Sequence, residues 1–326
     1  MTIIQLFHRS EIKHVVRLDK KVVDLVEDGF NALSDNKVQM PPIMRIDVPE
    51  HNGEVDIKSA YIRGYDSFAI KLSSGFFNNP QMGLPSANGL MILLSAETGR
   101  PMAILADQGL LTDLRTAAAG AVAARHLSRQ DSRTAGIIGT GAQARLQLEA
   151  LSLVRPIERV LVYGRDIKKA DAYKEDIEER LSLPVEVCAH PQEVAENSDI
   201  VVTTTPSSEP LIKGEWLQPG VHVTAMGSDA EHKQELETSV LVRADQLVCD
   251  VKAQSVRLGE LRNGQQETVD RAFELGEITS GRKQGRQSPD EVTVCDLTGT
   301  GVQDTVIARH VYSLLVPQEE IINGKS

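Results

Sequence analysis

The residues with the clearest chemical potential lie in one stretch near the middle of the chain, from Ala135 to Ala144. This stretch has the pattern of an apolar strand, a turn containing Gly139 and Gly141, and the start of a helix. Gly139 permits the turn, Gly141 lets the backbone approach a phosphate, and a helix N-terminus attracts anions. The pattern therefore predicts a dinucleotide site. The residues predicted to contact the dinucleotide here are Gly139, Thr140, Gly141, Ala142 and Gln143.

The end of the next strand bears on the choice of cofactor. The strand Arg159–Tyr163 is followed by Gly164, Arg165 and Asp166. An NAD site usually has an acidic residue here to bind the ribose 2′-hydroxyl, and Gly164 occupies that position. Arg165 could bind a 2′-phosphate, which favours NADP, but it could also be a solvated surface charge. Asp166 leaves NAD as an alternative, because the position of the acidic residue is uncertain by one residue. The cofactor is therefore predicted as NAD or NADP.

Further polar residues follow strands of the same half. Thr204 and Thr205 end one strand, and Met226 and Gly227 end another, so all four are predicted to contact the cofactor. Asp229 comes next and could orient or deprotonate an amine, or protonate a leaving group. The alternative is that Asp229 caps a following helix. Thr298 and Gly299 form a later glycine loop, which is predicted to return to the rim of the site and contact the cofactor.

The N-terminal part offers cations for an anionic substrate. Thr112 has the position of an N-cap for a helix Asp113–His126, so Arg115 is expected in the first turn. A cation is unfavourable at that end of a helix unless a carboxylate lies nearby. Arg45 and Lys71 lie on separate predicted strands and could converge on the same carboxylate. The pattern alone does not establish this convergence.

The elements that must position these residues change character along the chain. The pattern of the first part of the chain predicts a helix and then antiparallel strands, which is an α+β arrangement. From Ser128 onward strands and helices alternate, which predicts a Rossmann-type doubly wound parallel sheet. The fold class is therefore α/β with two domains, 1–128 together with about 302–326, and 129–301. The early elements are the helix Asp19–Leu33 and the strands Met44–Val48, Val55–Ile62, Phe68–Ser73, Gly89–Ser95 and Pro101–Ala106. The later strands are Thr134–Ile138, Arg159–Tyr163, Val185–Cys188, Ile200–Thr204, His222–Met226, Gln246–Cys249 and Val292–Leu297, before a helix Thr305–Leu315.

Composition excludes several classes of protein. A net charge of −11 over 326 residues argues against a general nucleic-acid or membrane surface. No signal peptide or spanning segment is visible, and Cys188, Cys249 and Cys295 lie in apolar contexts, so buried thiols and a cytoplasmic location are expected. The histidines form no metal-ligand spacing, so no metal site is predicted. The tail Pro317–Ser326 is expected to be loosely ordered.

Taken in order, the motifs resemble one family. They are Arg45, Ala69–Lys71, Gly83–Pro85, Leu111–Ala118, Ile138–Ala144 and Ala225–Asp229. Their order and spacing resemble the ornithine cyclodeaminase/mu-crystallin family over nearly the whole chain. The resemblance implies a homodimer whose N-terminal domain supplies both the dimer interface and the substrate site. It also implies that Arg45, Lys71 and Arg115 hold the α-carboxylate of an amino or imino acid. Asp229 and Lys71 are the predicted catalytic residues.

One departure from the family pattern bears on the substrate. Ornithine-cyclising members carry a glutamate about 13 residues before the carboxylate-binding lysine, where this chain has Lys58. A lysine repels an ornithine ammonium and attracts an acidic side chain, unless it points away from the site. The first hypothesis is an NAD(P)H-dependent imino acid reductase, with iminosuccinate reduced to aspartate as one example. The others are a cyclodeaminase with bound NAD, and a non-catalytic ligand-binding protein of the crystallin type.

Overall fold

The computed structural model describes residues 4–316, and the predicted loose tail lies outside them. The chain divides into two compact units: unit 1 holds the residues up to Leu18, Asp35–Arg115 and the residues from Thr300, and unit 2 holds Asp19–Ser34 and Thr116–Gly299. The predicted domain boundaries differ from this division, because 19–34 and 116–128 group with the second unit. Within residues 4–316 no helix has the length and apolar content needed to cross a membrane.

Unit 1 is built on a mixed sheet in the order β1-β7-β6-β5-β4-β2, with β3 also paired to β4. The strands are β1 (Gln5–His8), β2 (Val38–Gln39), β3 (Met44–Val48), β4 (Gly53–Ile62), β5 (Ser67–Phe76), β6 (Ala87–Ser95) and β7 (Pro101–Ala106). Only the β1–β7 pair is parallel among these strands. The unit also contains α1 (Arg9–Val15), η1 (Pro49–His51), η2 (Asn79–Met82) and α11 (Gly301–Leu315).

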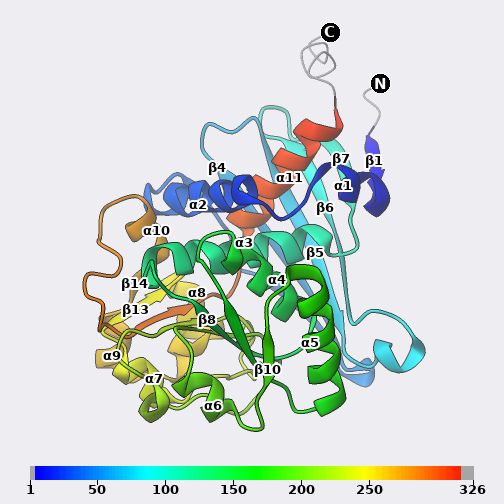
Figure 1. The fold of residues 1–326 in the computed structure, drawn as a ribbon. Helices are drawn as coiled ribbons and strands as arrows, with labels where there is room; N and C mark the ends of the chain where they lie inside the picture. The colour runs from blue at the N-terminus through cyan, green and yellow to red at the C-terminus, as the bar shows by residue number, and fades with distance from the viewer. Residues whose placement is uncertain (1–3, 317–326) are drawn as a thin grey trace. The chain divides into compact units, whose positions relative to one another are not determined.

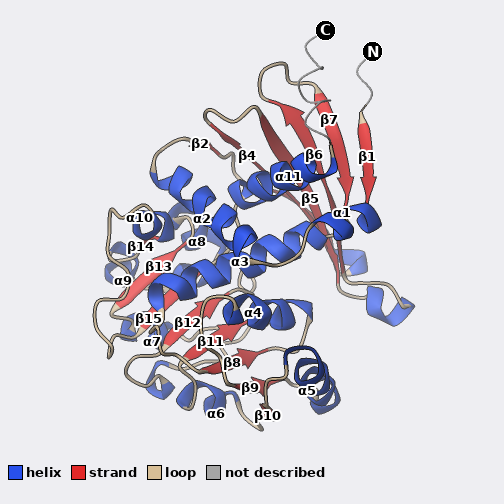
Figure 2. Cartoon of the chain, turned by 45° about the horizontal axis from the view of Figure 1, so that its top comes forward, coloured by secondary structure: helices blue, strands red, loops and turns tan. Residues whose placement is uncertain are grey.

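Helix α11 covers one face of this sheet, where it lies across β4 and β5 (Figure 2). Burial alternates along the strands accordingly: Ala60, Ala69 and Leu93 are buried, whereas their neighbours in sequence remain partly exposed. Such alternation is typical of an antiparallel sheet with one covered face. We call the opposite side, which α11 does not cover, the outer face.

Unit 2 contains an eight-stranded sheet in the order β10-β9-β8-β11-β12-β15-β13-β14, and every pair in it is parallel. Figure 2 labels all eight strands, and Figure 1 draws the ribbon of the same unit, mostly from green to orange. The strands are β8 (Thr134–Ile138), β9 (Arg159–Tyr163), β10 (Val185–Val187), β11 (Ile200–Thr203), β12 (His222–Ala225), β13 (Gln246–Cys249), β14 (Phe273–Glu274) and β15 (Thr293–Asp296). The helices are α2 (Lys20–Ser34), α4 (Ala142–Ser152), α5 (Ile167–Leu181), α6 (Pro191–Glu196), η3 (Gly214–Trp216), α7 (Thr238–Arg243), α8 (Lys252–Leu258), η4 (Glu260–Asn263), α9 (Gln266–Asp270) and α10 (Leu275–Thr279).

Both faces of the parallel sheet are buried, as a doubly wound sheet requires. On β8, Ala135 and Ile137 pack into one apolar core, while Ile138 packs into a second core. The strands therefore consist of nearly continuous apolar runs rather than alternating ones. The predicted fold class, a Rossmann-type parallel sheet with an α+β N-terminal unit, is confirmed. The expected burial of the three cysteine thiols is also confirmed.

The start of the long helix α3 (Leu110–Leu127), which begins in unit 1 and continues into unit 2, differs from the prediction. Thr112 is not its N-cap, because the helix already begins at Leu110. The carboxylate of Asp107 accepts a hydrogen bond from the Leu111 backbone N–H at 2.7 Å, and Gly109 turns the chain with φ of +84°. Arg115 therefore lies beyond the first turn, so the argument from the helix dipole does not apply to it.

Candidate active site

Three basic side chains of unit 1 gather around one buried carboxylate. Lys58 and Lys71 are cross-strand partners on β4 and β5, so both point to the face that α11 covers. Asp304 of α11 is completely buried; its carboxylate lies 3.2 Å from Lys71 Nζ and 2.9 Å from Arg115 Nε. The Arg115 guanidinium also donates a hydrogen bond to the Gln303 side chain at 2.8 Å. We call Lys58, Lys71, Arg115 and Asp304 the cation cluster.

The first turn of α11 is fixed against the strands that carry the two lysines. The Thr305 hydroxyl donates to the Ala60 carbonyl at 2.7 Å and accepts from the Ala69 backbone N–H at 3.1 Å. Ala60 and Ala69 are themselves register partners, two positions from Lys58 and Lys71. Gly301 approaches so closely that a Cβ there would lie 2.5 Å from the Ser59 backbone. These contacts set Asp304 beside the lysine pair.

Burial and charge shift the ionisation of this cluster. Burial together with the charges of Arg115 and Lys58 lowers the pKa of Lys71 to about 7, although Asp304 opposes that shift. Burial alone would raise the pKa of Asp304, but the Arg115, Lys71 and Lys58 charges hold it below its usual value. Lys71 and Arg115 share the single carboxylate of Asp304. When Lys71 is protonated, these two cations and one anion sum to a net positive charge in a buried place. A second anion, such as a substrate carboxylate, would balance it.

Arg45 has a different environment from the one predicted. Its guanidinium pairs with Glu54, with Asp47 at 2.8 Å and, more distantly, with Asp56 at 3.8 Å. Asp56 is its register partner on β4, so Arg45 shares the sheet face of Lys58. The structure thus unites Lys71 and Arg115, as the sequence suggested, but places Arg45 against acids. Its role as a carboxylate ligand stays a prediction.

The glycine turn of unit 2 has the geometry that a pyrophosphate needs. Gly139 has φ of +116°, and a Cβ there would lie 2.6 Å from the Thr204 hydroxyl oxygen, so only glycine suits this position. Gly141 forms the N-cap of α4 without any side-chain cap, which leaves the first N–H groups of α4 for another acceptor. A Cβ on Gly141 would meet no protein atom within 4 Å. This open approach to uncapped amides fits a bound phosphate group.

Arg145, which the sequence did not single out, holds this turn in shape. Its guanidinium donates to the carbonyls of Thr140 and Gly141 at 2.6 and 3.1 Å, and Asp176 accepts from it at 2.9 Å. The turn carbonyls are thus bound on the protein side. The signal that could have identified Arg145 is its place in the first turn of a helix with an uncapped N-terminus.

The strand end after β9 carries the residues relevant to the cofactor choice. Gly164 packs closely against the glycine turn, since a Cβ there would lie 2.6 Å from the Thr140 methyl group, which would have to move. Asp166 caps α5 by accepting from the backbone N–H groups of Lys168 and Lys169. This cap gives Asp166 a structural role. Arg165 is exposed beside the turn.

A buried glutamate joins two of the predicted cofactor loops. Glu235 accepts hydrogen bonds from the Thr205 backbone N–H at 2.6 Å and the Gly227 backbone N–H at 2.7 Å. The hydroxyls of Thr203 and Thr205 also donate to it. Four donors on one carboxylate fix the loops after β11 and β12 relative to each other. Sequence reasoning missed Glu235, because nothing in its local sequence indicates contact with those loops.

The loop after β15 is held in a similar way. The Asp250 carboxylate accepts from the backbone N–H groups of Thr298 and Gly299 at 2.8 and 2.7 Å, and from the Thr298 hydroxyl at 2.9 Å. Since β8, β11, β12 and β15 are adjacent parallel strands, the loops after their carboxyl ends share one edge of the sheet. The predicted cofactor residues on these loops are therefore gathered at that edge.

Asp229 follows β12 at the same edge. Its carboxylate lies 2.6 Å from Lys233 Nζ, and its side chain is 37% exposed while that of Lys233 is 8% exposed. No helix starts at Asp229, since the next helix, α7, begins at Thr238. The alternative prediction that Asp229 is a helix cap is therefore wrong. A partly exposed carboxylate that is held by a buried ammonium is suited to contact a nitrogen of a substrate.

The sequence profile of the Ornithine cyclodeaminase/mu-crystallin family matches residues 4–319. The chain belongs to this family. A Rhizobium meliloti (strain 1021) protein that carries a provisional dehydrogenase name is 52% identical over 312 residues, which are 94% of each chain.

Two solved structures of related proteins hold the nicotinamide cofactor. One is the Delta(1)-pyrroline-2-carboxylate reductase of Thermococcus litoralis in complex with NADH and L-proline, with a TM-score of 0.90, 32% identity and coverage of 95% of this chain and 97% of that chain. The other is an archaeal alanine dehydrogenase dimer with bound NAD, with a TM-score of 0.87, 33% identity and 95% coverage of both chains. NAD(H) is therefore a cofactor found in related structures of this family.

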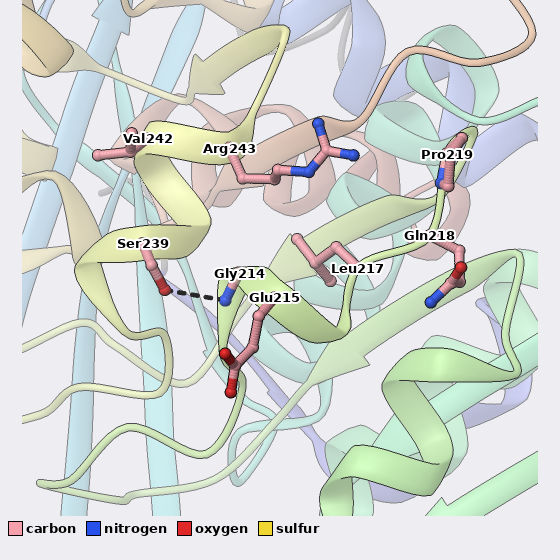
Figure 3. A pocket seen from close by; sticks show the side chains of 8 residues that line it. All are labelled: Gly214, Glu215, Leu217, Gln218, Pro219, Ser239, Val242 and Arg243. Atoms are coloured by element: carbon pink, nitrogen blue, oxygen red, sulfur yellow. Dashed lines mark hydrogen bonds between the residues drawn. The ribbon is translucent and has the colours of Figure 1, made fainter.

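A surface pocket of about 620 Å³ in unit 2 lies away from the edge that carries these loops (Figure 3). It is lined by η3, the segment leading into the amino end of β12, and α7. Its charged side chains, Glu215 and Arg243, point away from one another (Figure 3). The pocket therefore lies apart from the predicted cofactor loops, which follow the carboxyl ends of the strands.

Proposed function

We propose that the protein is an NAD(P)H-dependent oxidoreductase that reduces a small α-imino acid, and in reverse oxidises the amino acid. Its family membership and the NAD(H)-bound relatives support this proposal. Two features of the described units support it as well: an uncapped helix N-terminus behind a glycine turn in unit 2, and the cation cluster in unit 1.

Each unit has a separate task in this proposal. Lys71 and Arg115 bind the α-carboxylate, with the guanidinium as a directional ligand and the ammonium as a point charge. The nicotinamide, when bound, supplies the hydride that reduces the C=N carbon. Asp229 orients the imino nitrogen and stabilises its positive charge through the carboxylate that Lys233 holds in place. Reduction places the hydride on the α-carbon and leaves an amine.

We further propose that the side chain of the substrate is acidic, as in iminosuccinate. The observation that carries this step is the register of β4 and β5, which makes Lys58 the direct partner of Lys71. Lys58 is only 6% exposed and adds a third positive charge to the cation cluster. The alternative that Lys58 points away from the cluster does not fit this register. A distal ammonium such as that of ornithine would be repelled there, whereas a distal carboxylate would be attracted.

A substrate panel tests the proposed function. Oxidation of NADH and NADPH is followed with oxaloacetate, pyruvate or glyoxylate in the presence of ammonia, and with cyclic imines. We expect oxaloacetate with ammonia to give a kcat/KM at least about tenfold above the substrates that lack a second carboxylate, because the distal carboxylate gains an ionic partner. Release of ammonia from ornithine without net change of NAD(H) would instead identify a cyclodeaminase. Tight cofactor binding without any turnover would identify a ligand-binding protein of the crystallin type.

The same panel compares the two cofactors. The NAD(H) of the related structures favours NADH. Asp166 is engaged as the α5 cap, and the adjacent Arg165 is an exposed guanidinium able to pair with a 2′-phosphate. We therefore propose that NADPH is accepted as well.

We also propose that the protein forms a homodimer through the outer face of the unit 1 sheet. Two apolar rows cross this face from strand to strand. One row is Leu6, Ile104, Ile92 and Ile70, and the other is Met44, Ile57, Leu72 and Leu90. Leu6 is 53% exposed and Met44 58% exposed in the single chain. Contiguous apolar surface of this kind marks an interface, and the related alanine dehydrogenase is a dimer.

Replacement of Ile92 by glutamate tests the dimer. A charge in the middle of an apolar interface is expected to weaken association by at least about 100-fold, because it would be buried without a partner. Sedimentation velocity of wild type and variant at matched concentrations measures this effect. Val242→Glu is the matched control, since Val242 is an exposed apolar residue on α7 of unit 2. A wild-type monomer, or an Ile92→Glu dimer as tight as wild type, contradicts the proposal.

A further inference from the structure

We propose that Asp304 is a positioning residue of the carboxylate site, an internal counter-ion that holds Lys71 and Arg115 together and favours the protonated form of Lys71 that receives the substrate. This inference rests on the proposed function only in taking the ligand to be a carboxylate. Asp304 acts through the two basic residues and does not itself touch the ligand. Its removal should therefore affect carboxylate binding through the charge of Lys71.

The geometry gives Asp304 this role before any ligand arrives. Its carboxylate is completely buried and lies between the Lys71 ammonium and the Arg115 guanidinium. Removing one partner from such a buried group leaves an uncompensated charge, which lowers the stability of the fold several times more than breaking an exposed ion pair does. Like charges on Lys71 and Arg115 would otherwise repel each other. Asp304 thus lets two cations occupy one small buried region.

The fold around Asp304 is built to hold it in place. Asp304 lies in the first turn of α11, where the helix dipole favours an anion. The following residue, Thr305, bonds to both β4 and β5, and the preceding residue, Gln303, accepts from Arg115. The carboxylate is therefore anchored on both sides along the helix. It faces Lys58 from β4, Lys71 from β5 and Arg115 from α3, which are the charged groups that act on it.

The arrangement makes carboxylate binding depend on pH. Lys71 faces Asp304, Arg115 and Lys58, and its pKa is lowered to about 7 by burial and the two cations while Asp304 opposes the shift. Above that pKa the free protein has a neutral Lys71, so an arriving carboxylate must draw a proton onto it. Without Asp304, the pKa of Lys71 falls further. Carboxylate binding would then take up a proton even at pH values where wild-type Lys71 is already protonated. At pH values above the lowered pKa, binding would weaken.

Calorimetric titration with unreactive carboxylates tests this inference without relying on turnover. Succinate and propionate are titrated into the NADH-loaded protein near pH 6 and near pH 8, in two buffers of different ionisation enthalpy, which reports the protons taken up. For Asp304→Asn we expect a Kd about tenfold weaker than wild type near pH 8 and within about twofold of it near pH 6, with more proton uptake than wild type near pH 6. The double variant Asp304→Asn with Lys71→Arg should lose the pH-dependent defect, because arginine stays charged.

Three results would overturn the inference. They are an equal loss of binding at both pH values in Asp304→Asn, an unchanged proton uptake near pH 6, and a failure of Lys71→Arg to restore binding near pH 8. Asp66→Asn is the matched control, since Asp66 also pairs with an arginine of α11 but is 77% exposed in its side chain. If Asp304→Asn does not fold, Asp304→Glu replaces it: retention of wild-type proton uptake supports the inference, and its loss contradicts it. Carboxylate binding without imine reduction would contradict only the proposed function.

Discussion

Replacing Asp229 with asparagine is expected to lower kcat by about a thousandfold while the Kd for NADH changes by less than about threefold. Asparagine keeps the size of the side chain but removes the negative charge that stabilises the protonated imino nitrogen, which is the form that accepts a hydride. It also removes the ion pair with Lys233, whose Nζ lies 2.6 Å from the carboxylate. Steady-state kinetics on the best substrate of the panel, together with NADH fluorescence titration, measures both quantities.

The control for this variant must remove an ion pair of unit 2 without touching the proposed chemistry. Glu158→Gln does so, because Glu158 pairs with Arg133 and both side chains are more than half exposed. Its kcat should equal that of wild type, since exposed ion pairs contribute little to the stability of the fold. Loss of NADH binding in Asp229→Asn would give the residue a structural role, and an unchanged kcat would remove it from the reaction.

Much of the fold follows from local sequence patterns. The strands Thr134–Ile138, Arg159–Tyr163 and Gln246–Cys249 were predicted with their observed bounds, since buried apolar runs between turn residues are strong signals. The start of α3 was predicted wrongly because Thr112 is a common N-cap residue. The actual cap is Asp107, three residues before the helix, and it acts across a turn that Gln108 and Gly109 make with positive φ. Such a turn is not visible as a helix start in the sequence.

The site was predictable only in part, for a physical reason. The glycine turn is a local motif, so its residues could be named from spacing alone. Lys71 and Arg115 were named, but their partner Asp304 comes from the last helix and meets them only through tertiary packing. Glu235 is another long-range partner of this kind. A buried acid that neutralises a cation leaves no local pattern, because any exposed acid looks the same in sequence.

Replacing Lys58 with glutamate is expected to reverse the charge preference for the substrate side chain by about 100-fold in the ratio of kcat/KM values for acidic and cationic substrates. Lys58 is nearly buried and is the register partner of Lys71, so its charge acts on the bound ligand at short range. A glutamate there would attract a distal ammonium and repel a distal carboxylate. The α-carboxylate should still bind through Lys71 and Arg115. The measurement is kcat/KM for oxidation of aspartate and of ornithine with NAD or NADP.

Two further variants separate a local effect from a general one. Lys58→Met removes the charge without reversing it, so it should lower turnover of the acidic substrate without raising that of the cationic one. Lys37→Glu makes the same charge change at an exposed lysine of unit 1, which pairs with Asp35, and should leave the preference unchanged. Protein folding should survive Lys58→Glu, because the cations Lys71 and Arg115 remain beside Asp304. An unaltered substrate profile in a folded Lys58→Glu protein would mean that Lys58 does not select the side chain, and the acidic substrate would have to be abandoned.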